Sequence, residues 1–159
     1  MPRWGAEEAL ATLDEYLERA PVGFVLFDVE LRFVRANAAL AKITGRTPEE
    51  HLGRAPAALL GAVGAEVERE LQRVRATDEP RLDLELAGRL PSSPGEERRW
   101  LMSFYRARLP DGDAHGIGAT VVETTDQLRF AQELTAQRDL YETLLRARSQ
   151  MGEAFVLLE

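Results

Sequence analysis

Residues 32–54 read RFVRANAALAKITGRTPEEHLGR, and this stretch decides the fold. Its first part, residues 32–36, is typical of a short strand. Asn37 follows and can cap a short helix whose last periodic residue is Ile43. Gly45 is placed to end that helix in a left-handed conformation. The stretch therefore predicts a strand that leads directly into a one- to two-turn helix.

The signals on either side extend this pattern. Residues 47–50, Thr-Pro-Glu-Glu, form a capping box with proline at the first helical position, so a further helix begins there. Upstream, residues 22–27 are almost continuously apolar, which predicts a strand buried on both faces and paired with residues 32–36 as a hairpin. Residues 6–20 predict an amphipathic helix that Pro21 stops. Its narrow apolar stripe consists of Leu10, Leu13 and Leu17.

Downstream, hydrophobic periodicity predicts one more helix, three strands and a long terminal helix. Residues 80–87 alternate strictly between leucines and charged residues, which indicates a half-buried strand, and a loop is expected at residues 91–95. The expected elements are a helix over 63–77, strands over 80–87, 99–109 and 116–123, and a helix from Thr124 to about Met151. Strands and helices that come in runs, rather than in strict alternation, indicate an α+β fold with an antiparallel sheet.

Composition narrows the function classes. The chain has 159 residues with 45% hydrophobic residues, which suits one domain plus extra helix. A net charge of −7 argues against nucleic acid and anionic membranes as partners. The absence of cysteine excludes disulfides, thiol catalysis and cysteine–flavin photochemistry. No apolar run is long enough to cross a bilayer, so we expect a cytoplasmic protein.

The end of the chain weakly repeats a segment near its beginning. At an offset of 131 residues, Phe24-Val25-Leu26 aligns with Phe155-Val156-Leu157, and a helix precedes both segments. We therefore expect a helix-then-strand unit to begin again near residue 150. The expected organisation is an N-terminal amphipathic helix at 1–20, a sheet-containing domain at 21–124, a coiled-coil helix at 125–151 and the truncated start of a second module at 152–159.

Together these motifs resemble the PAS family of sensory domains over about residues 20–125. The matching features keep the family's order and spacing, although each is weak alone. They are Pro21-Val22-Gly23-Phe24, Asp28, residues 32–37, Ile43-Thr44-Gly45, residues 47–50, Leu52-Gly53-Arg54, Trp100 and the closing Glu123-Thr124-Thr125. The last triplet departs from the family's usual Asp-aliphatic-Thr, but it keeps a carboxylate and a hydroxyl at the joint between the last strand and the signalling helix.

The resemblance implies a five-stranded antiparallel sheet in the order 2-1-5-4-3, with short helices on one face around a small cavity. It also implies a non-enzymatic module of a bacterial signalling protein that carries a histidine kinase, diguanylate cyclase or phosphatase domain. In such a module a small ligand or a partner biases the arrangement of the C-terminal helix. The alternative is a ligand-free PAS domain that serves only homodimerisation or protein–protein interaction. An enzyme is the competing class, but no catalytic residues present themselves.

The sequence assigns no cofactor. Haem-binding PAS domains place an axial histidine on the helix that here spans residues 63–77, and this segment has none. The reactive cysteine of flavin photosensors falls near Pro56, so we expect neither haem nor covalent flavin. His51 follows two glutamates and can meet helix-terminal carbonyls as a cation, and His115 lies in a loop where a solvated turn is expected in preference to a metal site.

A small-molecule ligand would occupy the cavity. Ser103 and Tyr105 share one strand face and Trp100 lies on the other, and the sequence leaves open which face meets the cavity. A filled core without a ligand is the alternative reading. The predicted lining consists of Phe24, Leu26, Asn37, Leu59, Leu71, Ser103, Tyr105 and Val121.

The terminal helices predict a parallel homodimer. Phe130, Leu134, Tyr141 and Leu144 fall near the alternating four- and three-residue spacing of a coiled coil, which Gln137 interrupts. A helix that folds back over the sheet is the alternative. The N-terminal stripe at Leu10, Leu13 and Leu17 could likewise pair with its symmetry mate or cover the outer sheet face.

Overall fold

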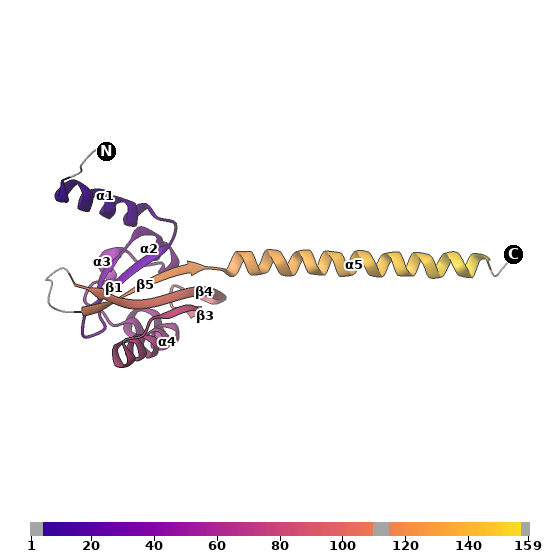
Figure 1. The fold of residues 1–159 in the computed structure, drawn as a ribbon. Helices are drawn as coiled ribbons and strands as arrows, with labels where there is room; N and C mark the ends of the chain where they lie inside the picture. The colour runs from indigo at the N-terminus through magenta and orange to yellow at the C-terminus, as the bar shows by residue number, and fades with distance from the viewer. Residues whose placement is uncertain (1–4, 110–114, 157–159) are drawn as a thin grey trace. The chain divides into compact units, whose positions relative to one another are not determined.

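The computed structural model describes residues 5–109 and 115–156; within it the side chains of residues 127–129 and 150–156 are not described. The chain divides into two compact units, residues 1–123 and residues 124–159. The first unit contains the sheet and the helices α1 to α4 (Figure 1), and the second contains α5.

Five antiparallel strands form the sheet in the order β2-β1-β5-β4-β3, which confirms the expected strand order and the α+β fold. The strands are β1 Gly23–Phe27, β2 Phe33–Ala36, β3 Arg81–Leu90, β4 Ser93–Arg108 and β5 His115–Glu123. The first and last strands of the sequence lie side by side at the centre, because β1 pairs with β5. The end of β5 is thereby held inside the sheet and not at its edge.

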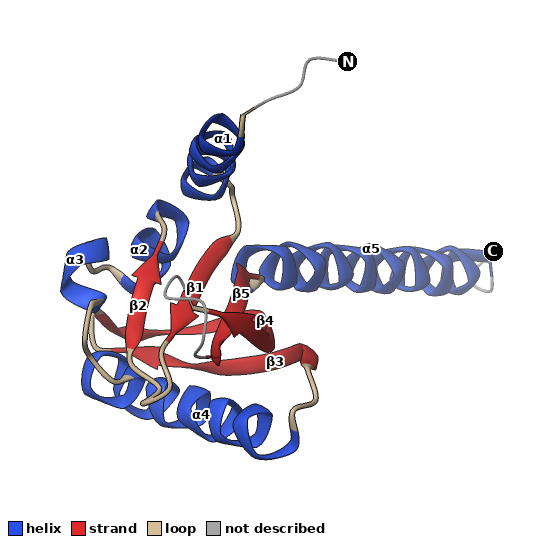
Figure 2. Cartoon of the chain, turned by 60° about the vertical axis from the view of Figure 1, so that its left-hand side comes forward, coloured by secondary structure: helices blue, strands red, loops and turns tan. Residues whose placement is uncertain are grey.

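Helices cover one face of this sheet (Figure 2). These covering helices are α2 Ala38–Thr44, α3 Pro48–His51 and α4 Pro56–Thr77, whereas α1 Ala6–Arg19 contacts α2. The predicted caps are confirmed: the Asn37 side chain accepts from the Leu40 amide, and Thr47 and Glu50 form the capping box of α3. The long α4 lies along β3 and β4, and Gly61 breaks it, since φ 59° and ψ −131° at this residue are not helical.

The core lies between the helices and the inner sheet face. Its fully buried large side chains include Phe27, Phe104, Leu71 and Val74. Inward residues alternate along β1, as Val25 and Phe27 show. None of the α1 residues is buried, so this helix adds no side chain to the core.

The strict alternation predicted for residues 80–87 is interrupted. Asp83 has a positive φ of 53°, and the pairing of β3 with β4 shifts between Arg81 and Leu84. Leu82 is consequently 60% exposed, whereas Leu84 and Leu86 pack against the core. The expected loop at 91–95 is also shorter, because β4 already begins at Ser93. Its first residues pair with the end of β3 and so gain ladder hydrogen bonds.

The second unit is the helix α5 Thr125–Val156. Residues 152–156 are therefore helical, where the internal repeat predicted the start of a strand, and residues 157–159 lie outside the described residues. A helix satisfies its backbone hydrogen bonds within the segment, whereas a strand needs a neighbouring strand to pair with. The second module remains a prediction. Among the described residues, no helix combines the length and the apolar character needed to cross a membrane.

Candidate functional site

A small cavity lies between α2, α4 and the inner face of the sheet, and its volume is about 40 Å³. Each element contributes the residues that its own periodicity turns inward, such as Leu60, Val63 and Val67 on one side of α4. Its lining consists of Leu40, Ile43, Thr44, Leu60, Val63, Val67, Leu90, Trp100, Met102 and Val121. Thr44 and Trp100 carry the polar side-chain atoms of this otherwise apolar set.

Trp100 is the most unusual member of the lining. Its side chain is only 3% exposed, and its Nε1 is the one buried side-chain nitrogen or oxygen of the described residues that has no hydrogen-bond partner. The guanidinium carbon of Arg98 lies 5.6 Å from the centre of the Trp100 ring, within the range of a cation–π contact. Trp100 thus contacts both the cavity and a charged residue at the end of the sheet.

Arg98 also holds the last residue of β5. Its Nε and one terminal nitrogen donate to the two carboxylate oxygens of Glu123 at 2.6 and 2.7 Å. The side chains of this bidentate pair are only 13% and 30% exposed, so water screens the pair weakly. Glu123 was predicted as part of the signalling joint together with Thr124 and Thr125. Thr124 is half-buried, and Thr125, the first residue of α5, is buried.

His51 does not line the cavity but contacts Thr44, which does. It is fully buried, and its Nδ1 lies 2.7 Å from the Thr47 carbonyl oxygen while its Nε2 lies 3.0 Å from Thr44 Oγ1. A carbonyl can only accept, so Nδ1 carries the proton and Nε2 accepts from the Thr44 hydroxyl. The edge of the His51 ring faces Phe33, with ring centres 5.1 Å apart.

Burial lowers the pKa of His51, although hydrogen bonds to backbone carbonyls and the charge of Glu50 oppose this shift. The expected cation at the helix end is therefore wrong at neutral pH: His51 meets a carbonyl there, but as a neutral donor. Burial in the core outweighs the attraction of the helix terminus.

Four of the predicted pocket residues lie on the opposite face of the sheet. Phe24 and Leu26 alternate with the buried residues of β1, and Ser103 and Tyr105 alternate with those of β4. They are half-buried on the outer face and do not line the cavity between the helices. The prediction that they share this cavity is corrected for a simple reason: both faces of these strands are apolar, so periodicity gives two faces but not their environments.

The outer positions form their own contacts. Tyr105 lies opposite Gly118 in the ladder, and a side chain at Gly118 would come within 2.7 Å of the Tyr105 ring. The ring therefore covers the glycine, and burial raises the pKa of Tyr105. Ser103 Oγ accepts from the amide of Asp83 at 3.0 Å, which satisfies the irregular residue of β3.

The remaining predicted pocket residues lie on the helical side. Val121 lines the cavity, whereas Leu59 and Leu71 are buried in α4 outside the lining. Asn37 is fully buried. Its side-chain nitrogen donates to the carbonyls of Leu17 and Val22, and its Oδ1 accepts from the backbone amides of Phe24 and Leu40. These bonds join α1, β1 and α2, so no Asn37 atom is left to orient a ligand.

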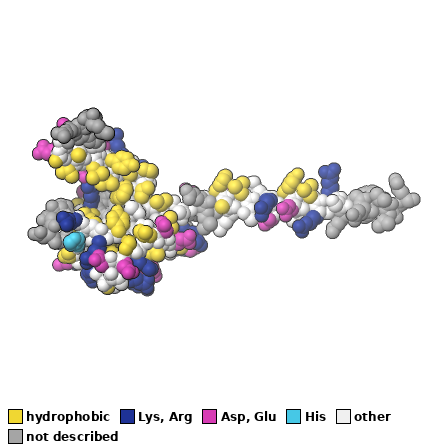
Figure 3. All heavy atoms as spheres, viewed as in Figure 1, with side chains coloured by type: hydrophobic (Ala, Val, Ile, Leu, Met, Phe, Trp, Pro, Cys, Tyr) yellow, Lys and Arg dark blue, Asp and Glu magenta, His cyan; other side chains and the backbone are white. Residues whose placement is uncertain are grey.

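Sequence reasoning missed Trp100 as a lining residue because it could not choose between the two faces of β4. A signal was present, since Trp100, Met102 and Phe104 form an uninterrupted apolar face while Ser103 interrupts the other. The predicted dimer residues lie at the surface: Leu10, Leu13, Phe130, Leu134, Tyr141 and Leu144 are 51–66% exposed and Leu17 is half-buried. Figure 3 shows hydrophobic side chains on the surface of α1 and, separately, along α5.

Comparison with known proteins identifies the fold. A family model described as the PAS fold matches residues 17–129. A PAS domain from Colwellia psychrerythraea is similar at a TM-score of 0.60 and 12% identity, over 74% of this chain and 98% of that chain. A PAS domain from a two-component sensor histidine kinase is similar at a TM-score of 0.57 and 12% identity, over 75% and 99%.

A third similar structure belongs to a larger receptor. The Vibrio cholerae VqmA dimer, described as a LuxR-type receptor, matches at a TM-score of 0.62 and 19% identity, over 74% of this chain and 52% of that chain. The match thus spans about half the length of VqmA. At these identities the likeness concerns the fold alone. No curated protein matches the chain by sequence.

Proposed function

The chain belongs to the PAS family, and from this premise we propose that it is a sensory module that transmits the state of its cavity to helix α5. The observation that carries the proposal is the continuous contact from the cavity through Trp100 and Arg98 to Glu123. Glu123 is the last residue of β5, and α5 begins two residues later at Thr125. The proposed role is non-enzymatic.

In the proposed transmission, the start of α5 has two arrangements, and occupancy of the cavity changes their relative populations. A molecule in the cavity contacts Trp100, and Trp100 supports the guanidinium group that grips Glu123. A shift of the indole changes the geometry of a bidentate pair, which tolerates little misalignment. The start of α5 then has two preferred directions or registers, and occupancy of the cavity selects between them.

The output of the module is proposed to be a parallel homodimer that acts on a following domain, such as a histidine kinase, diguanylate cyclase or phosphatase domain. The exposed seam of Phe130, Leu134, Tyr141 and Leu144 supports this, because its spacing suits a two-stranded coiled coil. Burying three or four such side chains contributes about 5–10 kcal/mol from each subunit before association costs, so a micromolar dimer is the tightest that we expect once those costs are subtracted. A weak seam can change register.

A second candidate function is a ligand-free PAS domain that only dimerises. The small cavity favours it, because about 40 Å³ leaves little room for a ligand unless the helices move. The apolar outer face, with Phe24, Leu26 and Tyr105 half-exposed, offers a further surface for a second copy. The two candidates differ in whether Trp100 and Arg98 affect α5.

Sedimentation velocity at tens of micromolar tests the dimer, using the intact chain and a version that ends at Asp126. We expect the intact chain to be dimeric and the shortened one monomeric. The double substitution Leu134→Ser/Tyr141→Ser should also give a monomer, whereas Glu133→Ser/Glu142→Ser on the same helix should not. If the intact chain is monomeric, the dimer proposal fails; if the shortened chain remains dimeric, α5 is not the dimer contact.

Amide hydrogen exchange tests the transmission. Arg98→Ala should raise the exchange rates of residues 125–134, because Glu123 loses its bidentate partner. Arg99→Ala is the matched control, since Arg99 is the next residue of β4 and is exposed on the other face. Equal exchange in the two variants would favour the ligand-free alternative and contradict transmission through Arg98.

A further inference from the structure

Helix α5 carries two exposed leucines that the seam of the proposed dimer does not include. Leu140 is 61% exposed and Leu145 is 44% exposed. In the heptads of the seam, Leu134 and Tyr141 occupy position a, so Leu140 falls at position g and Leu145 at position e. Positions e and g flank the a and d positions on both sides. The apolar surface of α5 is therefore wider here than the seam alone.

The preceding heptad carries opposite charges at the same two flanking positions. Glu133 is at position g and Arg138 is at position e. Both side chains are exposed, and neither forms a salt bridge within the described part of the chain. Asp139 and Arg146 instead lie at position f, on the side of the helix away from the seam. The flanks of the seam thus present one acidic and one basic side chain to another helix.

A parallel pair of two copies in register brings these flanking residues together by kind. In such a pair, each g residue faces the e residue that comes five positions later on the other helix. Glu133 then meets the partner's Arg138, and Leu140 meets the partner's Leu145. Each contact occurs twice, because the pair is symmetric. The flanks are therefore complementary in charge in one heptad and in apolar character in the next.

Other pairings of α5 lose these matches. Antiparallel helices place g beside g and e beside e, so Glu133 does not meet the partner's Arg138. A parallel pair shifted by one heptad places the polar Gln137 opposite Phe130 or Leu144, where its amide has no partner. In register, Gln137 faces the partner's Gln137, and the two amides can hydrogen-bond. Charge and polarity together favour one occupant of this surface, a second copy of α5 in the same direction and register.

We propose that α5 selects a second copy of itself, in parallel and in register, through Glu133 and the partner's Arg138. Leu140 and the partner's Leu145 extend the apolar contact in the next heptad. Helices that carry like charges at these positions are rejected as partners, because the charges would face each other. This inference rests on the proposed dimer and names the residues that determine its orientation.

Charge reversal tests the contact of Glu133 with the partner's Arg138. Glu133→Arg and Arg138→Glu should each weaken dimerisation of the intact chain about tenfold, because like charges replace two ion pairs. Loss of charge alone, as in Glu133→Ser, should weaken it only about threefold. The double variant Glu133→Arg/Arg138→Glu restores opposite charges and should recover the affinity to within about threefold. Sedimentation equilibrium measures these dissociation constants.

Controls for net charge come from position f. Asp139→Arg and Arg146→Glu make the same changes in charge as the two reversals, but on the side of the helix away from the seam. Each should leave the dissociation constant unchanged within about twofold. Equal weakening by the reversals at position f would show an effect of net charge and contradict a specific contact.

Cysteine cross-linking tests direction and register. The chain contains no cysteine, so a single introduced thiol reports one contact. Leu144→Cys places the thiol at position d, where parallel helices in register bring it close to its own copy. Arg146→Cys is the control at position f. Under air oxidation, Leu144→Cys should form the covalent dimer about tenfold faster than Arg146→Cys, or more.

Two results would overturn the inference and leave the proposed dimer standing. If the intact chain is dimeric but the double variant is as weak as either single reversal, Glu133 does not contact the partner's Arg138. If the chain is dimeric but Leu144→Cys cross-links no faster than Arg146→Cys, the helices are not parallel and in register. A monomeric intact chain would contradict the proposed dimer itself, and the exchange comparison of Arg98→Ala with Arg99→Ala tests transmission separately.

Discussion

Adjacent residues of β4 lie in opposite environments. Phe104 is fully buried beneath the helices, whereas Tyr105 lies half-exposed over Gly118 on the outer face. Both faces carry aromatic and aliphatic side chains, so composition does not distinguish them. The difference is that α2, α3 and α4 pack against the inner face, whereas among residues 5–109 and 115–123 no helix makes comparable contacts with the outer face. The inner face therefore carries stability and the cavity, while the outer face is available for contacts.

The largest expected effect comes from truncating the neighbouring aromatic residues of β4. Phe104→Ala should lower the free energy of unfolding by about 3–5 kcal/mol, because it leaves a cavity in the core. Tyr105→Ala should cost about 1 kcal/mol, since its ring is half-exposed. Urea unfolding at a fixed protein concentration measures both values. Similar losses in the two variants would contradict the contrast between the faces.

The next largest expected effect comes from replacing Asn37, the buried polar residue that joins α1, β1 and α2. Asn37→Ala should cost about 3 kcal/mol, because it removes a helix cap and leaves buried backbone groups unsatisfied. The matched control is Thr47→Ala, which removes an exposed cap of α3 and should cost about 1 kcal/mol. The same urea experiment applies. An equal cost for both caps would show that burial of Asn37 adds nothing to an ordinary cap.

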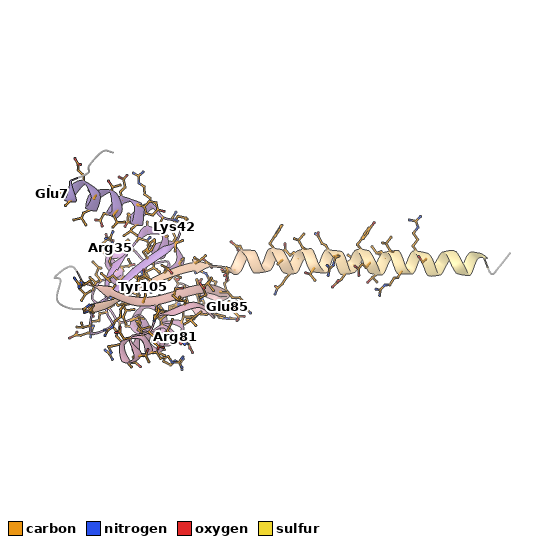
Figure 4. All side chains as sticks on the ribbon, in the orientation of Figure 1. Glu7, Arg35, Lys42, Arg81, Glu85 and Tyr105 are labelled. Carbon is orange, nitrogen blue, oxygen red and sulfur yellow. The ribbon has the colours of Figure 1, made fainter. Side chains whose placement is uncertain are left out.

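Two ion pairs, one on each face of the sheet, should differ by a smaller free energy. A double-mutant cycle with Arg98→Ala and Glu123→Gln should give a coupling energy of about 1–2 kcal/mol, because this pair is bidentate and mostly buried. The pair of Arg35 with Asp14 of α1 is exposed (Figure 4 labels Arg35), and its coupling should be about 0.5 kcal/mol.

The coupling energies of these two pairs should also differ in their sensitivity to ionic strength. Raising the ionic strength should reduce the coupling of Arg35 with Asp14 and leave that of Arg98 with Glu123 nearly unchanged. The inner-face assignment of Arg98 would be contradicted by a coupling that is equally small and equally sensitive to salt.

The smallest expected effect is the pH dependence contributed by His51. Burial lowers its pKa in the folded state, so the unfolded chain binds a proton more readily than the folded protein. The His51 contribution to stability is therefore complete above pH 6.5 and is lost as the pH falls through the lowered folded pKa. Arg46 acts in the same direction as burial, whereas Glu50 opposes it.

Thermal unfolding between pH 8 and pH 5 measures this effect. His51→Gln should be less stable at pH 8 but should lose less stability on acidification than the unchanged protein. His115→Gln, at an exposed position, should keep the full dependence. Parallel pH profiles for the unchanged protein and His51→Gln would contradict the assignment of a buried, neutral His51.

Local signals in the sequence were sufficient for the elements around residues 32–54. The cap at Asn37, the left-handed Gly45 and the capping box at residues 47–50 are formed by contacts between residues close in the chain. Such contacts depend little on the rest of the fold, so they could be predicted with their boundaries. The strand order came from the resemblance to the PAS family, which these same motifs support.

The candidate site could be predicted only in part, because it depends on which face of the sheet the helices cover. Val121 lines the cavity on the helical side, whereas Ser103 and Tyr105, which were chosen over Trp100 on β4, lie on the outer face. A shift of one residue exchanges the two faces of a strand, and on β4 only Ser103, which interrupts one apolar face, distinguished them. The bulge at Asp83 could not be predicted for a similar reason, since it reflects pairing with a distant strand.

The sequence by itself therefore determined α2 and α3 with their caps, the PAS-type order of elements and the exclusion of thiol chemistry. Only the tertiary structure decided that Trp100 lines the cavity, that Arg98 grips Glu123 and that His51 is buried and neutral. The physical reason is the range of the interactions. Caps and turns join residues within a few positions, whereas burial, cavities and ion pairs such as Arg98 with Glu123 join residues that only the folded sheet brings together.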